Sequence, residues 1–311
     1  MPNLKHARQF MQRELVTLPL HLDVLQAVER LVNDNISGAP VIDDAGRYQG
    51  VFSEKCSLTA LTTAAHVAAE TGLQIDLARD FMVSQITTVS ADNDVFDAID
   101  HLLKRRISGA PVIDGRGQFL GVFSEKTAMR VLAAAAHDQL PGTNVGSYMN
   151  TDRDRIVSRN TNLLEVAELF LTTPFRRLPV LEGEQIHGQI SRRDVLRAEL
   201  RLAWELVRVA REPQAAGMLN ASTLAATVAD FIDRQAETIT ESTDLLTIAQ
   251  RFINTPYRRL PVLAGERVVG QVSRRDVLSA ASDLLRPDTA RPHAETLYLS
   301  NVQETRPPSL G

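Results

Sequence analysis

The sequence contains a single cysteine, Cys56, and a single tryptophan. One thiol cannot form an intrachain disulfide or a thiolate zinc cage. No apolar run approaches the ~20 residues of a membrane span, and the first residues lack the apolar core of a signal peptide. We therefore expect no contact with a membrane, and a cytoplasmic location.

Catalytic motifs are also missing. The seven histidines show neither H-x-H nor H-x-x-x-H spacing for a metal, and no P-loop or dinucleotide glycine motif occurs. Cys56 has no assigned base beside it, which favours a packing role over a nucleophilic one. The net charge of −4 argues against a nucleic-acid partner. These absences predict a protein that is not an enzyme, with no catalytic residue and no metal site.

What the sequence does contain is one unit repeated four times. Residues 257–278 read YRRLPVLAGERVVGQVSRRDVL, and residues 175–196 read FRRLPVLEGEQIHGQISRRDVL. Residues 36–57 and 107–128 are degenerate versions that share ISGAPVID and GVFSEK. A repeat of this kind determines the architecture of the whole chain.

The unit predicts a strand, a tight turn, a second strand and a helix. Pro261 opens the first strand, and Gly265 lies in the turn. Ser273 is placed to cap the helix, with Asp276 in its first turn. The exposed amino end of such a helix is a natural seat for an anion.

These residues carry a resemblance to a known family. Gly270, Ser273 and Asp276 match the G-x-x-[ST]-x-x-D signature of the cystathionine β-synthase (CBS) domain, and the chain resembles that family from about residue 15 to 285. The resemblance implies an α/β (α+β) fold of four CBS-type units, each a small sheet with flanking helices. It also implies two pseudo-twofold pairs (Bateman modules), whose clefts commonly hold an adenosine-containing ligand.

Units one and two are more alike than either is like units three and four. We therefore expect a first pair at residues 1–141 (units 1–72 and 73–141) and a second at 142–285 (units 142–212 and 213–285). Residues 214–222 resemble a linker, and the proline-containing tail at 286–311 is expected to be flexible.

The second half carries two arginine pairs per unit, one before a strand and one opening a helix. Arginine forks bind phosphate in bidentate fashion, and the resemblance implies that the Asp binds ribose and the Ser contacts ribose or phosphate. In the alternative, Ser and Asp only cap a helix and the arginines form salt bridges. The predicted nucleotide-binding residues are Arg176, Ser191, Arg193, Asp194, Arg258, Ser273, Arg275 and Asp276.

The first half has lost these features. The Asp position is Cys56 in unit one and Thr127 in unit two, and Glu54 and Glu125 stand where the second half has Arg. A nucleotide phosphate would be repelled by these carboxylates. We expect no ligand in the first-half motifs.

The function predicted from these features is that of a stand-alone regulatory protein that senses an adenosine-type ligand in its second half. No cofactor is firmly indicated, and AMP, ADP or ATP would act as the regulatory ligand. A homodimer is expected, acting on a regulated protein that the sequence does not identify. The alternative is a ligand-free scaffold that acts through protein–protein assembly.

Overall fold

The computed structural model describes residues 5–70, 75–136, 143–210 and 226–281, and one unit occurs four times within them. Each unit has a three-stranded sheet, in which the first strand is parallel to the second and the second is antiparallel to the third. The predicted α+β fold class with four units is confirmed. The linker predicted at 214–222 and the tail at 286–311 lie outside the described residues.

The four units have the same order of elements. Unit one contains β1 (Leu18–Pro19), α1 (Val24–Asn33), β2 (Gly38–Ile42), β3 (Tyr48–Ser53) and α2 (Glu54–Glu70). Unit two contains β4 (Val89–Ser90), α4 (Val95–Lys104), β5 (Gly109–Ile113), β6 (Phe119–Ser124) and α5 (Glu125–Ala136). Unit three contains β7 (Val157–Ser158), α6 (Leu163–Thr172), β8 (Arg177–Glu182), β9 (Gln185–Ser191) and α7 (Arg192–Ala210). Unit four contains β10 (Ile239–Thr240), α9 (Leu245–Asn254), β11 (Arg259–Ala264), β12 (Arg267–Ser273) and α10 (Arg274–Ala280).

A short helical turn precedes each unit, in a segment that we call its leading segment. The four turns are η1 (Ala7–Gln9), α3 (Ala78–Phe81), η2 (Val145–Ser147) and η3 (Val228–Asp230). Each leading segment crosses to the sheet of another unit instead of folding onto its own. Units one and four exchange leading segments, as do units two and three, through the backbone bridges Gln12–Gln271, Val51–Asp233, Val83–Gln189 and Val122–Asn150.

The glycine of each repeat motif makes this exchange possible. A Cβ on Gly188 would lie 2.7 Å from the carbonyl oxygen of Val83, and one on Gly121 would lie 2.6 Å from that of Asn150. Real Cβ atoms do not approach backbone that closely, so only glycine admits the crossing segment.

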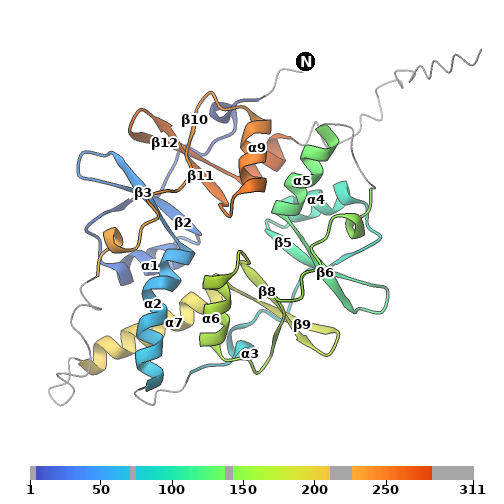
Figure 1. Cartoon of the computed structure of the whole chain (residues 1–311), viewed down its shortest axis with the longest axis horizontal. Coiled ribbons are helices and arrows are strands. Elements are labelled where there is room, and N and C mark those ends of the chain that lie inside the picture. Colours follow the sequence, from blue (N-terminus) through green and yellow to red (C-terminus); the bar gives the residue numbers. More distant parts are fainter. Residues whose placement is uncertain (1–4, 71–74, 137–142, 211–225, 282–311) are drawn as a thin grey trace, which may run out of the picture.

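Helices pair the units in a different combination. One buried core joins units one and three, where α2 packs against α6 and α7, and a second core joins units two and four, where α5 packs against α9 and α10. The four units thus form a ring in which sheet contacts alternate with helix contacts (Figure 1). Burial of these helical faces is the main source of stability in such an assembly.

This arrangement differs from the predicted pairing of unit one with two and of three with four. Each exchanging pair instead contains one first-half and one second-half unit. Sequence similarity between units was the basis of the prediction, but similarity says which units diverged together and not which surfaces meet. Contact is determined by where each leading segment crosses, and the motif glycines are identical in all four units.

Candidate functional site

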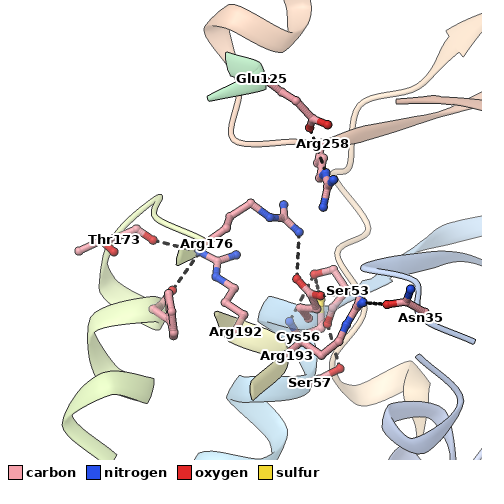
Figure 2. Close-up of polar contacts among 12 residues, drawn as sticks. Asn35, Ser53, Cys56, Ser57, Glu125, Thr173, Arg176, Arg192, Arg193 and Arg258 are labelled. Carbon is pink, nitrogen blue, oxygen red and sulfur yellow. Dashed lines mark hydrogen bonds and ion pairs between the residues drawn. The ribbon is translucent and has the colours of Figure 1, made fainter. Parts of the chain in front are cut away.

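Two charge clusters lie around the centre of the ring. In the first, the Glu54 cluster, Glu54 of unit one accepts hydrogen bonds from Arg176 and Arg193 of unit three, each at 3.1 Å. Arg193 also donates to Asn35, a contact drawn in Figure 2. Burial alone would raise the pKa of Glu54, but the two guanidinium groups outweigh burial and hold it below its ordinary value.

The second cluster, the Glu125 cluster, repeats this arrangement between units two and four. Glu125 forms ion pairs with Arg258 at 3.3 Å and Arg275 at 3.4 Å. Its side chain is only 3% exposed, yet its Oε1 atom has no hydrogen-bond partner among the described residues. The second cluster is therefore the less tightly bonded of the two.

The structure thus brings together four of the predicted phosphate ligands with the two glutamates expected to repel phosphate. Each of these arginines forms an ion pair with one of the two glutamates: Arg176, Arg193, Arg258 and Arg275. The alternative interpretation of the arginines, as salt-bridge partners, accounts for these contacts. A phosphate would have to compete with a carboxylate for each of them.

The predicted ribose ligands bond to the serines that precede α7 and α10, and Ser273 and Asp276 complete a capping box at α10. Asp194 accepts hydrogen bonds from the backbone N–H and the hydroxyl of Ser191, at 2.8 and 2.6 Å. Asp276 does the same with Ser273, at 2.8 and 2.7 Å. Only Oδ2 of each carboxylate is used in this way. The ribose role of these residues stays a prediction.

Two cavities lie between the exchanging units. The 2/3 cavity has a volume of about 220 Å³ and is lined by residues that include Ser124 and Thr127 of unit two and Arg155, Phe175 and Arg177 of unit three. Seven cationic side chains and one carboxylate surround it: Lys126, Arg130, Arg155, Arg176, Arg177, Arg258, Arg274 and Glu125. Such a concentration of positive charge favours an anion.

The 1/4 cavity has a volume of about 520 Å³ and is lined mainly by units one and four, with Arg176 and Arg192 added from unit three. Five cations and two carboxylates surround it: Lys55, Arg176, Arg192, Arg258, Arg259, Asp230 and Asp233. Both cavities open onto the first-half motifs, Ser53 and Cys56 in one case and Ser124 and Thr127 in the other. The expectation that the first-half motifs hold no ligand stays a prediction, although both motifs border a cavity.

The second arginine of each pre-strand pair borders a cavity, although it is not among the predicted nucleotide-binding residues. Arg177 lines the 2/3 cavity, and Arg259 occupies the equivalent place in the 1/4 cavity. Among the described residues neither forms a hydrogen bond or a close ion pair, and the buried Nη1 atom of Arg259 has no hydrogen-bond partner there. The carboxylates of Asp194 and Asp276 act on Arg177 and Arg259, respectively, without bonding to them. Burial lowers the pKa of both, that of Arg259 to about 10, and a guanidinium group stays charged at neutral pH in proteins.

Arg155 is a further residue that no repeat motif indicated. It is 9% exposed, its guanidinium lies 4.2 Å above the ring of Phe175, and its Nε atom has no hydrogen-bond partner among the described residues. Burial lowers its pKa to about 10. No repeat period marks this residue, because it lies in the variable stretch before β7.

Arg192 and Arg274 serve the fold. Each donates to two carbonyl groups at the end of the preceding helix, Arg192 to Phe170 and Thr173 (Figure 2). Arg274 repeats this with Phe252 and Thr255. Their main task is to satisfy helix ends that would otherwise be buried without partners.

In the described part of the chain, no group of three or more His, Cys, Asp or Glu side chains is arranged to hold a metal ion. None of the described helices combines the length and the apolar character needed to span a bilayer.

Comparisons with known proteins agree with the repeat. The CBS domain family model matches residues 7–55, 78–134, 145–201 and 228–283. The uncharacterized protein MJ1225 of Methanocaldococcus jannaschii is 21% identical over 199 residues, 61% of this chain and 68% of that protein. The chloroplastic CBS domain-containing protein CBSX2 of Arabidopsis thaliana is 29% identical over 154 residues, 40% of this chain and 64% of that protein.

Among solved structures, that of CBSX2 in complex with AMP is 31% identical, covers 40% of this chain and 97% of that chain, and has a TM-score of 0.36. This chain thus matches about two thirds of the length of each of the two relatives named above. The family model alone matches most of the chain, at four successive places. The chain belongs to the CBS domain family and carries four CBS units.

Proposed function

We propose that this protein is a regulatory sensor that binds adenosine-type nucleotides in the 2/3 and 1/4 cavities. The phosphate would lie against Arg177 in the first cavity and Arg259 in the second. Occupancy would be passed on through the shape or assembly of the ring. The homodimer, the regulated protein and the cytoplasmic location predicted from the sequence belong to this proposal as well.

The observation that carries the proposal is that neither Arg177 nor Arg259 forms a close ion pair with a carboxylate of the described residues. Both are half-buried, and a partly desolvated charge without a close partner is costly. Arg177 and Arg259 occur at equivalent positions, each beside a cavity, and each lacks the carboxylate that its neighbour in the sequence has. A phosphate matches the geometry of the arginine fork and would supply the missing negative charge.

The nucleoside half of the ligand has candidate partners too. Oδ1 of Asp276 is held only by Gln12 at 3.3 Å, and Oδ1 of Asp194 only by Arg197 at 3.7 Å. Neither aspartate lines a cavity itself, but each acts on the arginine proposed to hold the phosphate, Asp194 on Arg177 and Asp276 on Arg259. Phe175 and Tyr257 lie at equivalent positions and line the two cavities, where either ring offers a surface for a base.

Titration calorimetry with AMP and with adenosine tests the proposal; AMP is the first probe because it is the ligand named for the CBSX2 structure. Charge-assisted hydrogen bonds contribute about 1.5–3 kcal/mol each, so Arg177→Gln and Arg259→Gln should each weaken AMP binding in their own cavity by at least ~10-fold. Adenosine affinity should change little, since it lacks the phosphate. Arg13→Gln, at an arginine that is 60% exposed, is the matched control. Equal AMP binding by wild type and the Arg177→Gln/Arg259→Gln double variant would refute the assignment.

The ribose role has its own test. Asp194→Asn and Asp276→Asn keep the size of the side chain but remove its charge. Together they should weaken adenosine binding by at least ~10-fold, because a diol donates more strongly to a carboxylate than to an amide. Unchanged adenosine affinity, with a stability loss of about 1 kcal/mol per lost cap, would show that these residues only cap their helices.

A further inference from the structure

The two arginines of each pre-strand pair have different positions relative to the cavities. Arg177 lines only the 2/3 cavity and Arg259 only the 1/4 cavity. Arg176 and Arg258, the first members of the pairs, line both. Their guanidinium groups point toward one another across the centre of the ring (Figure 2). One arginine of each pair is therefore private to a cavity, and the other is shared.

Each shared arginine also pairs with the glutamate of one charge cluster. Arg176 belongs to unit three but is bonded to Glu54 of unit one, and Arg258 belongs to unit four but is paired with Glu125 of unit two. Each contact thus runs from one exchanging pair of units to the other. When a shared arginine moves toward one cavity, the electrostatic potential in the other cavity becomes less positive.

We propose that the two cavities are negatively coupled through Arg176 and Arg258, so that phosphate bound in one weakens phosphate binding in the other. The proposal rests on the nucleotide-binding function proposed above and adds the way in which its two sites regulate each other. A guanidinium fork binds one phosphate in bidentate fashion at a time. A phosphate that takes a shared arginine therefore removes a donor from the second cavity.

A second effect acts in the same direction. When Arg176 or Arg258 turns toward a phosphate, Glu54 or Glu125 loses a partner while remaining almost fully buried, at 9% and 3% side-chain exposure. Its uncompensated negative charge then repels the next phosphate. Adenosine, which carries no phosphate, should bind both cavities without this penalty.

The order of filling follows from the charges around the two cavities. Seven cations and one carboxylate line the 2/3 cavity, against five cations and two carboxylates in the 1/4 cavity. The 2/3 cavity should therefore fill first with AMP. The 1/4 cavity should fill second, and its affinity in the wild type is the one that coupling reduces.

Calorimetric titration with AMP separates coupled from independent cavities. Arg177→Gln disables the 2/3 cavity for AMP. The Kd of the remaining 1/4 cavity should then be at least ~5-fold lower than the second Kd of the wild type, because a factor of about 5 is the low end of typical coupling between sites. Arg155→Gln disables the same cavity from another side chain and should give the same result, which guards against a folding defect in one variant. With adenosine, whose binding does not need Arg177, the titrations of wild type and Arg177→Gln should coincide.

A remaining Kd equal to the second wild-type Kd, in both variants, would overturn the coupling while leaving nucleotide binding intact. Tightening of the same size with adenosine would also overturn it, because phosphate would then not be the cause. Absence of any binding of AMP and adenosine would instead refute the proposed function itself. In the Arg176→Gln/Arg258→Gln double variant, AMP should bind both cavities more weakly, and disabling the 2/3 cavity should no longer tighten the other.

Discussion

Glu199 offers a test of how the helices of units one and three are packed. This glutamate lies on α7, is 3% exposed, and accepts a hydrogen bond from the hydroxyl of Thr62 on α2 at 3.1 Å. Its Oε2 atom has no partner among the described residues. Burial raises its pKa from 4.5 to about 8, so the carboxyl group is protonated in the folded protein at neutral pH.

The sign of the effect follows from proton linkage. The folded state holds this proton more tightly than the unfolded state, so the contribution to stability is fully present below pH 4.5 and is lost as the pH rises through about 8. Each unit of pKa difference corresponds to about 1.4 kcal/mol. The free energy of unfolding should therefore fall by about 5 kcal/mol from this group alone, mostly between pH 5 and 8.

Glu199→Gln keeps the shape and the hydrogen bond but cannot ionise. Urea unfolding of wild type and variant at half-unit steps from pH 5 to 9, followed by fluorescence of Trp204 on the same helix, gives the difference in stability at each pH. Wild type minus variant should fall by about 1.4 kcal/mol per pH unit between pH 5 and about 7.5 and level off above pH 8. Parallel curves for the two proteins would show that Glu199 is not protonated in a buried helix interface, and the reasoning would fail.

Two further predictions concern the exchange and the charge clusters. Gly188→Ala places a Cβ within 2.7 Å of the Val83 carbonyl oxygen and should lower the free energy of unfolding by more than ~2 kcal/mol in a denaturant titration. The control is Gly115→Ala, whose Cβ meets nothing within 4 Å and which should lower it by less than ~0.5 kcal/mol. Glu54→Gln removes the carboxylate that competes for Arg176, so it should tighten AMP binding by about 5-fold or more while leaving adenosine unchanged; weaker AMP binding would mean that Glu54 positions the arginine for phosphate.

The repeat determined how much could be predicted from the sequence. The strand–turn–strand–helix order, the capping of α10 by Ser273 and the four-unit fold follow from local chemistry, because turn residues, caps and apolar strands act over a few positions. Each of these features was present in the printed motif itself. The structure confirms the four units as predicted.

Which unit meets which could not be predicted in the same way. The residues that admit a crossing segment, such as Gly188 and Gly121, are the same in every unit, so they do not specify a partner. The glutamates show the limit most clearly. Glu54 was interpreted as repelling phosphate within unit one, whereas its place in the ring makes it the partner of Arg176 from unit three. Long-range contacts of this kind leave no local pattern in the sequence.

Native mass spectrometry during titration with AMP tests the central claim most directly, because it counts the ligands on each chain. The account predicts that a first AMP binds at low concentration and a second at a clearly higher one, up to two per chain from the two cavities. The Arg177→Gln/Arg259→Gln double variant should stay almost free of AMP at the concentration that fills the first site of the wild type. Two results would contradict the claim that these cavities are nucleotide sites. In one, the wild type binds no AMP; in the other, the double variant binds AMP as well as the wild type does.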